Sequence, residues 1–348
     1  MPDEIRHFPN IETERLLLRR PRVEDFDTIA EYRSDPEVVR YQDWALPYDR
    51  KRGLERLVKS VEQGGPTANG GWNLTVADRS DERVLGDLYL GGEWNGRSAE
   101  IGYTLAAEHW GQGYAGEAVR AALGWLFEDP KLARVGATLH PENTASAQLL
   151  ERNGFHFEGR TRDSFWVGDV LSDDAIYGLT RSDWEAWNAR PTGAPDVVRF
   201  VEVSEANQHA VRKLRVHHSQ EGFVAPVAAS MADALFPEII DGAPVVPWMR
   251  AVEADGELAG FVMIAEVTDA HPEPYLWRLL IDRSHQRRGI GRRIIELLVE
   301  EVASRGSTTL MTSWVDGRGS PRPFYEGLGF VPTGEIIDDE IEGRLTFG

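Results

Sequence analysis

The sequence predicts an α/β (α+β) protein built from two tandem domains of the same fold. Its 348 residues exceed the size at which a single hydrophobic core normally stops growing. The segment NARPTGAPDVV at 188–198 contains two prolines and a glycine, which interrupt helices and strands. The order of predicted elements before this segment recurs after it. We therefore expect an N-terminal domain at 1–189, a linker at 190–196 and a C-terminal domain at 197–348.

Strand-like and helix-like segments alternate along the N-terminal half. They are identified by hydrophobic periods of two residues for strands and of about 3.6 residues for helices. In chain order, we predict strand 15–21, helices 23–32 and 49–61, hairpin 72–90, strand 99–105, helix 113–127, strand 133–139, helix 143–155 and strand 175–180.

The C-terminal half repeats this order with a nearly constant offset. Gly113 precedes Gly289 by 176 positions, and Gly154 precedes Gly329 by 175. One fold has therefore been duplicated. The predicted elements are strand 198–203, a helical stretch, hairpin 249–267, strand 275–282, helix 289–301, strand 308–315, helix 321–330 and strand 343–347.

In each half a strand runs through a small-residue turn into an amphipathic helix, at Gly113 and at Gly289. The first N–H groups of such a helix lack intrahelical acceptors, and the helix dipole favours an anion there. A glycine turn alone is a weak signal, since these turns match neither a P-loop nor the three-glycine dinucleotide fingerprint. The dense basic stretch RRGIGRR at 287–293 strengthens the interpretation as a local anion site.

Longer motifs carry a resemblance to a known family. QRRGIG at 286–291, followed by FYEGLGF at 324–330, resembles the GNAT superfamily of acyl-CoA-dependent N-acyltransferases. Four stretches of the N-terminal half are similar to the branch of this superfamily that includes ribosomal-protein N-terminal acetyltransferases. They are ETERLLLRRP, AEIGYTL, HWGQGYAGEAV and NTASAQLLERNGF. The C-terminal half is vaguely similar to diamine and antibiotic N-acetyltransferases. The resemblance covers 11–185 and 198–347, and it implies two tandem GNAT folds, each a mixed, mostly antiparallel central sheet flanked by helices.

The resemblance implies acetyl-CoA as the cofactor, with its pyrophosphate held by the glycine turn. No metal is expected. The implied contacts in the first half are Leu105, Gln112, Gly113, Tyr114, Ala115, Gly116 and Asn143. Those in the second half are Leu280, Ile281, Arg287, Arg288, Gly289, Ile290, Gly291 and Arg292. Gly289 and Gly291 would let the backbone approach the anion, and the arginines would add charge.

Acetyl transfer to an amine sets chemical requirements that any such site must meet. A lysine-like amine has a pKa near ~10.4, so a base or desolvation must supply its neutral form. The leaving thiolate needs an acid, and the oxyanion needs a donor, typically a strand N–H freed by a bulge. The chain has no cysteine, so we expect direct attack in a ternary complex rather than a thioester on the protein.

The candidate acids differ between the halves. By resemblance, Tyr325 in FYEGLGF donates the proton, although a buried tyrosine of the core would look the same. Leu150 occupies the corresponding place in the first half and cannot donate. There the resemblance implies Ser146 together with Asn143, a pair that an ordinary helix N-cap would also explain.

The candidate bases differ as well. Glu100 in AEIGYTL resembles the general base of lysine acetyltransferases. Counting back equally from the glycine turn, its counterpart in the second half is Leu276. Glu266 or a chain of water molecules are the alternatives for the second half.

Charge and composition narrow the partners. A net charge of −19 argues against a nucleic-acid partner. The acidic surface either keeps the protein soluble or attracts cationic substrates. The run DDEIE at 338–342 either lies on a solvated turn or binds an ammonium group. The chain has neither the plan of a secretion signal nor an apolar run that would span a bilayer, so we expect a cytoplasmic protein without a membrane partner.

The combined prediction is an N-acetyltransferase that acts on a primary amine of a small cationic metabolite or antibiotic. One alternative is N-terminal acetylation of a protein or peptide. Another is that one domain has lost its chemistry and serves as a scaffold or an acyl-CoA sensor. A homodimer is left open.

Overall fold

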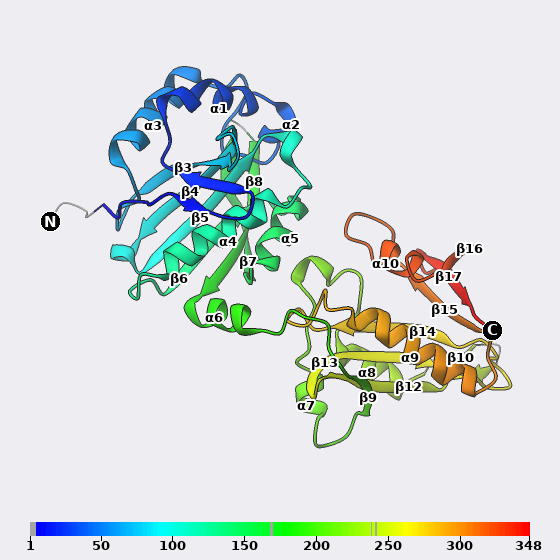
Figure 1. Ribbon diagram of the computed structural model, residues 1–348. Helices are drawn as coiled ribbons and strands as arrows, with labels where there is room; N and C mark the ends of the chain where they lie inside the picture. The colour runs from blue at the N-terminus through cyan, green and yellow to red at the C-terminus, as the bar shows by residue number, and fades with distance from the viewer. Residues whose placement is uncertain (1–4, 168–169, 238, 241) are drawn as a thin grey trace. The chain divides into compact units, whose positions relative to one another are not determined.

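The computed structural model describes residues 5–167, 170–237, 239–240 and 242–348 (Figure 1). The chain divides into two compact units, Met1–Asn188 and Ala189–Gly348. Each unit contains its own central sheet, flanking helices and hydrophobic clusters. The predicted duplication of one α/β fold is confirmed.

The sheet of the N-terminal unit has eight strands in the order β1-β2-β3-β4-β5-β6-β8-β7. Neighbouring strands are antiparallel except β5 and β6, which are parallel. The strands are β1 (Ile11–Glu12), β2 (Leu16–Arg19), β3 (Gly71–Asp78), β4 (Val84–Glu93), β5 (Ser98–Leu105), β6 (Arg134–Leu139), β7 (His156–Val167) and β8 (Val170–Thr180).

Helices cover both faces of this sheet (Figure 1). On one face, α4 buries Ala118, Ala122 and Leu126 in a cluster with the strands. On the other, Ile29 and Leu57 of α1 and α3 pack in a separate cluster. The helices are α1 (Phe26–Tyr32), α2 (Pro36–Val39), α3 (Arg50–Gln63), α4 (Tyr114–Phe127), α5 (Thr144–Arg152) and α6 (Arg181–Ala189), with 3₁₀ turns at Val23–Asp25, Trp94–Gly96 and Ala107–His109.

The C-terminal unit repeats the plan with seven strands in the order β16-β17-β15-β14-β13-β12-β9. Among the described residues of this sheet, only β14 and β15 are parallel. The strands are β9 (Val198–Glu202), β12 (Pro247–Ala254), β13 (Glu257–Ala265), β14 (Tyr275–Ile281), β15 (Thr309–Trp314), β16 (Val331–Ile337) and β17 (Glu340–Thr346), and β10 (Ile239–Ile240) pairs separately with β11 (Ala243–Pro244).

Alternate residues of β13 face opposite helix layers. Val262 and Ile264 belong to the cluster that includes α9, whereas Phe261 and Met263 belong to the cluster that includes α7 and α8. The helices are α7 (Gln208–Val211), α8 (Val227–Leu235), α9 (Ile290–Ser304) and α10 (Arg322–Glu326), with a 3₁₀ turn at His218–Gln220.

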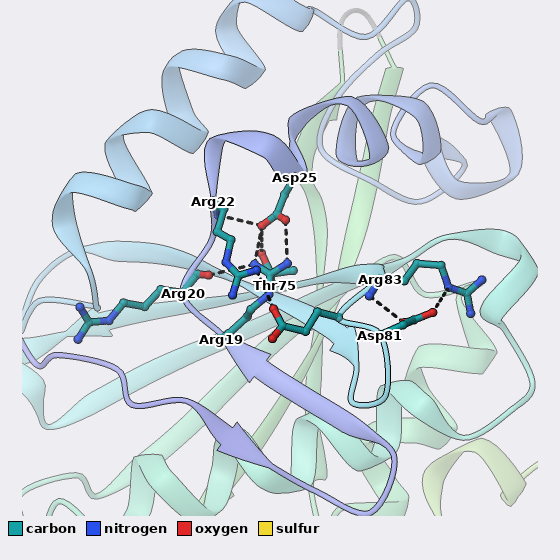
Figure 2. A network of polar contacts seen from close by, with 8 residues as sticks. Arg19, Arg20, Arg22, Asp25, Thr75, Asp81 and Arg83 are labelled. Atoms are coloured by element: carbon teal, nitrogen blue, oxygen red, sulfur yellow. Dashed lines mark hydrogen bonds and ion pairs between the residues drawn. The ribbon is translucent and has the colours of Figure 1, made fainter.

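A buried ion pair fixes the chain where it enters α1 (Figure 2). Arg19 of β2 donates two 2.8 Å hydrogen bonds to the Asp25 carboxylate, which also accepts the Thr75 hydroxyl and the Arg22 backbone N–H, each at 2.9 Å. Burial opposes ionisation of Asp25, but these hydrogen bonds outweigh it and lower the pKa of the carboxyl. The network ties the α1 layer to β2 and β3.

Candidate active site

Both glycine turns have the backbone geometry that an anion cradle requires. Gly113 and Gly289 are the N-cap residues of α4 and α9, with φ of 84° and 79°. Side chains other than glycine rarely adopt this left-handed conformation. The helical ladder starts with Glu117 N–H to Gly113 O at 3.1 Å and Arg293 N–H to Gly289 O at 3.2 Å. The N–H groups before them therefore lack intrahelical acceptors and lie at the turn.

The three arginines of the second turn, Arg287, Arg288 and Arg292, differ in exposure and in hydrogen bonding. Arg287 and Arg292 are exposed beside Gly289. Arg288 is buried, and its Nε donates to the Gly193 carbonyl at 2.8 Å while its Nη1 donates to His285 at 2.8 Å. The Arg288 side chain thus holds the linker onto the C-terminal unit, which leaves Arg287 and Arg292 as the charges available to an anion.

The second glycine of this turn serves packing. A Cβ on Gly291 would lie 3.1 Å from the Phe324 ring of α10. The Phe324 ring would have to yield by a few tenths of an ångström to a side chain there. Gly291 thus lets α9 and α10 pack closely, and its expected contact with the anion stays a prediction.

The first turn is braced by an arginine that the sequence analysis missed. Arg15 donates from Nε to Glu117 at 2.8 Å and from Nη1 to the Gln112 carbonyl at 2.9 Å, and its guanidinium lies 4.6 Å from the centre of the Tyr114 ring. Glu117 also accepts the Thr13 hydroxyl at 2.5 Å. Arg15 thus pairs its charge with Glu117 and holds the residues before β2 against the turn that Gly113, Ala115 and Gly116 form.

The parallel strands pair only at the end away from the glycine turns. The β5–β6 pairs run from Ser98 to Glu100, and the β14–β15 pairs are Tyr275 with Met311 and Leu276 with Thr312. The remaining residues of β5 and β14 have no partner on β6 or β15 within the described registers. Their ends hold the expected cofactor contacts Leu105, Leu280 and Ile281.

A β-bulge distinguishes the two domains. In the C-terminal sheet, Met263 pairs with Arg278 and Ile264 with Leu276, so Trp277 is an extra residue in β14. The β4–β5 register runs without a shift from Gly86–Leu105 to Glu93–Ser98. Along these strands, therefore, only the C-terminal domain has the bulge that typically frees a strand N–H for an oxyanion.

The bulge also corrects the expected counterpart of Glu100. Eight residues before each glycine turn, Leu105 pairs with Gly86 and Ile281 with Gly260. Five residues further along β4 and β13, Gly91 pairs with Glu100 and Ala265 with Tyr275. Glu100 therefore corresponds to Tyr275, and Leu276 is not its counterpart, because the extra residue shifts the offset between halves from 175 before the bulge to 176 after it.

Tyr325 lies at the paired end of β14 and β15. Its ring stacks on Trp314 with centroids 5.6 Å apart at 17°. The Thr312 hydroxyl donates to the Leu276 carbonyl at 3.1 Å. Burial raises the pKa of Tyr325 to about 12. The residue is thus part of the core and also presents a protonated phenol where the strands separate.

Glu100 lies on the face of β5 opposite α4 and is half-buried. Burial raises its pKa, and the negative charges of Glu93, Asp174 and Asp43 raise it further. A carboxylate in this environment binds a proton more readily than an ordinary glutamate, which suits a general base.

Asn143 and Ser146 form a helix N-cap. The Asn143 Oδ1 accepts the Ser146 backbone N–H at 3.2 Å. The Ser146 carbonyl accepts the hydroxyl of Tyr103 at 3.2 Å, and burial raises the pKa of Tyr103 well above its ordinary value. The N-terminal domain thus places a phenol beside Ser146, although Leu150 occupies the place of Tyr325. Tyr103 is not among the residues expected from the sequence.

Glu266 is already engaged as an ion-pair partner. Its carboxylate lies 2.8 Å from Arg305, and this hydrogen bond raises the pKa of the guanidinium. The Glu266 carboxylate is therefore engaged with Arg305 in this structure. In 5–167, 170–237, 239–240 and 242–348, no group of three or more His, Asp or Glu side chains is arranged to hold a metal.

Two stretches of the chain, one in each unit, match descriptions of known acetyltransferases. Residues 15–156 match the description "Acetyltransferase (GNAT) domain", and 212–330 match "Acetyltransferase (GNAT) family". An uncharacterized N-acetyltransferase of Bacillus licheniformis, p20, is 33% identical over 177 residues, which cover 49% of this chain and 96% of p20. The chain belongs to the GNAT acetyltransferase family. It is a GNAT N-acetyltransferase with two domains, and the family uses acetyl-CoA.

A further relative and a solved structure each match about half of this chain. The [ribosomal protein uS5]-alanine N-acetyltransferase of Escherichia coli is 24% identical over 181 residues, which cover 49% of this chain and 91% of that protein. A GNAT-family acetyltransferase structure from Bacillus anthracis is 26% identical, has a TM-score of 0.44 and matches 50% of this chain and 99% of its own. No helix in the part of this GNAT chain that the structure describes is long and apolar enough to cross a membrane.

Proposed function

We propose that this GNAT protein acetylates a primary amine of a small cationic molecule by direct attack. Acetyl-CoA supplies the acetyl thioester, and its anionic pyrophosphate would lie at the two glycine turns, beside Arg287 and Arg292 in the C-terminal domain. The predicted contacts Gln112, Tyr114, Asn143 and Ile290 belong to the same proposal.

The observation that carries the choice of acceptor is the surplus of carboxylates at equivalent places in both domains. Burial raises the pKa of Glu100, and the negative charges of Glu93, Asp174 and Asp43 raise it further. At the equivalent Tyr275, burial raises the pKa of the phenol, a hydrogen bond with Ser313 lowers it, and Glu342, Glu340 and Asp338 raise it. Such negative surroundings attract an ammonium group.

The proposed roles follow the geometry of each domain. In the C-terminal domain, Tyr325 gives a proton to the departing sulfur, and the strand N–H freed at Trp277 stabilises the oxyanion. In the N-terminal domain, Glu100 takes the proton of the amine. Ser146, with Tyr103 hydrogen-bonded to its carbonyl, is the proposed hydroxyl near sulfur.

The experiment is an acetylation screen of the full-length chain against a panel of primary amines, with products detected by mass spectrometry. The panel pairs each cationic di- or polyamine with an uncharged or anionic amine of similar size. We expect the cationic members to be acetylated at least about tenfold faster, a difference of about 1.4 kcal/mol in activation free energy. Preference for anionic amines would refute the choice of acceptor.

A second candidate is N-terminal acetylation of a peptide by the N-terminal domain. It is supported by the similarity to the [ribosomal protein uS5]-alanine N-acetyltransferase of Escherichia coli. Peptides with an N-terminal alanine belong in the same panel. Acetylation of these peptides alone, with every small amine inert, would favour this candidate over the first.

A further inference from the structure

The linker before β9 is fastened to the C-terminal unit at both ends of the segment 193–197. At one end, Arg288 Nε donates to the Gly193 carbonyl at 2.8 Å. At the other, the Val197 N–H donates to the carboxylate of Asp255, in the turn between β12 and β13, and the Asp255 N–H donates to the Val197 carbonyl, each at 2.9 Å. Arg288 and Asp255 are themselves an ion pair at 3.7 Å. These contacts lie within the second compact unit and together hold the segment against it.

Arg288 belongs at the same time to the glycine turn. It lies between Arg287 and Gly289, which have φ of 62° and 79°. A non-glycine residue in this left-handed region, such as Arg287, is strained and persists there only when the surrounding structure holds it. The buried Arg288 guanidinium supplies part of that hold, because it also donates from Nη1 to His285 at 2.8 Å. Since a guanidinium can only donate, the His285 ring is the acceptor, and burial and the charge of Arg288 lower its pKa.

The other side of the turn is anchored by Gln286. Its Nε2 donates to the Ile281 carbonyl at 3.1 Å and to the Gln220 side chain at 2.8 Å. An amide nitrogen has two hydrogens, so both are used within the protein. Gln286 and Arg288 thus hold the chain on both sides of Arg287. These two anchors fix the shape of the turn and with it the direction of the N–H groups that would face an anion.

The N-terminal domain is braced at the same place. Strands β2 and β9 occupy equivalent positions in the two sheets, so the segment before β2 corresponds to the linker before β9. Arg15, directly before β2, donates to the carbonyl of Gln112. Gln112 precedes Arg288 by the same 176 positions that separate Gly113 from Gly289. In each domain, the segment that leads into this strand is therefore tied to the residue before the N-cap glycine, and in the C-terminal domain that segment is the linker.

We propose that acetyl-CoA binding at the C-terminal turn and docking of the linker stabilise each other. The proposal rests on the proposed place of acetyl-CoA at this turn. The docked linker fixes Arg288 and so keeps the turn in the conformation that binds the anion, which is therefore bound by a preorganised site. Because coupling between two equilibria is reciprocal, the bound anion in turn holds Arg288 on Gly193. The segment that leads to the N-terminal domain is held more firmly when the C-terminal domain has its cofactor.

The first test measures docking of the linker directly. It uses full-length chains with Gly113→Glu, which places a negative charge in the N-terminal turn and confines acetyl-CoA binding to the C-terminal domain. The Val197 N–H is hydrogen-bonded to Asp255 when the linker is docked, so its hydrogen/deuterium exchange reports docking. Saturating acetyl-CoA should slow this exchange by roughly 5–150-fold, the usual range of coupling between two sites.

The second test is calorimetric titration of Asp255→Gly with acetyl-CoA, for which coupling and simple electrostatics predict opposite signs. Asp255 has φ of 54°, which glycine adopts freely, so the substitution removes the carboxylate without straining the turn. Loss of a negative charge alone should strengthen binding of an anion. Loss of the linker contact should instead weaken acetyl-CoA binding by at least roughly fivefold. Glu257→Gln, an exposed residue of the same hairpin, is the control of equal charge change and should not weaken binding.

Two results would overturn the coupling. One is unchanged exchange of the Val197 N–H in chains that calorimetry shows to be saturated, and this result needs no substitution in the linker or its partners. The other is binding by Asp255→Gly that is as tight as in the parent chain. Acetyl-CoA binding that survives Gly289→Glu in the Gly113→Glu background would refute the proposed place of the cofactor, and the coupling would fall with it.

Discussion

Tyr325→Phe separates catalysis from packing in the C-terminal domain. The substitution removes one oxygen and leaves the ring stacked on Trp314. Thr312 keeps its 3.1 Å hydrogen bond to the Leu276 carbonyl, so no buried donor loses its only acceptor. Loss of this buried hydroxyl should therefore cost about 1 kcal/mol of the free energy of unfolding.

The kinetic effect should be much larger if the hydroxyl acts as the acid. Loss of general acid catalysis lowers single-turnover acetylation roughly 10²–10⁴-fold, or about 2.7–5.5 kcal/mol of activation free energy. Burial raises the pKa of Tyr325 to about 12, so the wild-type phenol stays protonated at neutral and moderately alkaline pH. The defect should shrink as pH rises past ~8.5, the ordinary pKa of a thiol, because the thiolate then leaves without a proton.

The assay compares single-turnover acetylation by wild type and Tyr325→Phe from neutral to alkaline pH, in full-length chains that carry Gly113→Glu. Calorimetric titration should show unchanged acetyl-CoA binding. Tyr177→Phe, which removes a buried phenol of the N-terminal core, is the matched control and should leave turnover unchanged. If Tyr325→Phe is as fast as wild type at neutral pH, Tyr325 is only a core residue, and Glu100 with Ser146 become the seat of catalysis.

Three further predictions concern stability and domain structure. Glu100 has a raised pKa in the folded state, so its ionisation opposes folding above the ordinary carboxyl pKa of ~4.3. Glu100→Gln should therefore melt at a higher temperature than wild type at pH 7 but not at pH 4. A lower melting temperature of Glu100→Gln at pH 7 would contradict the raised pKa. Asp25→Asn should lower the urea-derived free energy of unfolding by about 3 kcal/mol, because Arg19 loses its buried partner. The control Asp27→Asn, at an exposed position, should change this free energy little. Equal effects of the two substitutions would refute the reasoning. Limited proteolysis with a non-specific protease should cut first within 188–198, and first cuts inside either domain would move the proposed boundary.

The features that depend on local pattern were predictable from the sequence. The duplicated order of elements, the glycine N-caps at Gly113 and Gly289 and the buried stripe of α4 all follow from periodicity and turn chemistry. Long-range pairing was not predictable in the same way. The bulge at Trp277 is a property of the β13–β14 register, and counting along the chain without it assigned Leu276 in place of Tyr275.

Side-chain partners were the other gap. Arg15 and Glu117 are 102 positions apart, Tyr103 and Ser146 are 43 apart, and Ser313 and Glu340 are 27 apart. Such contacts exist only once the sheet has formed. An arginine such as Arg288 looks like a phosphate ligand in sequence, and its engagement with Gly193 becomes visible only in the fold.

Calorimetric titration of the full-length chain with acetyl-CoA tests the central claim most directly, because the claim is that both domains keep a working anion cradle. We expect about two binding sites per chain, one in each domain. Gly113→Glu and Gly289→Glu should each remove one site and leave the other. A stoichiometry of one that Gly113→Glu leaves unchanged and Gly289→Glu abolishes would contradict the claim and reduce the N-terminal domain to a scaffold.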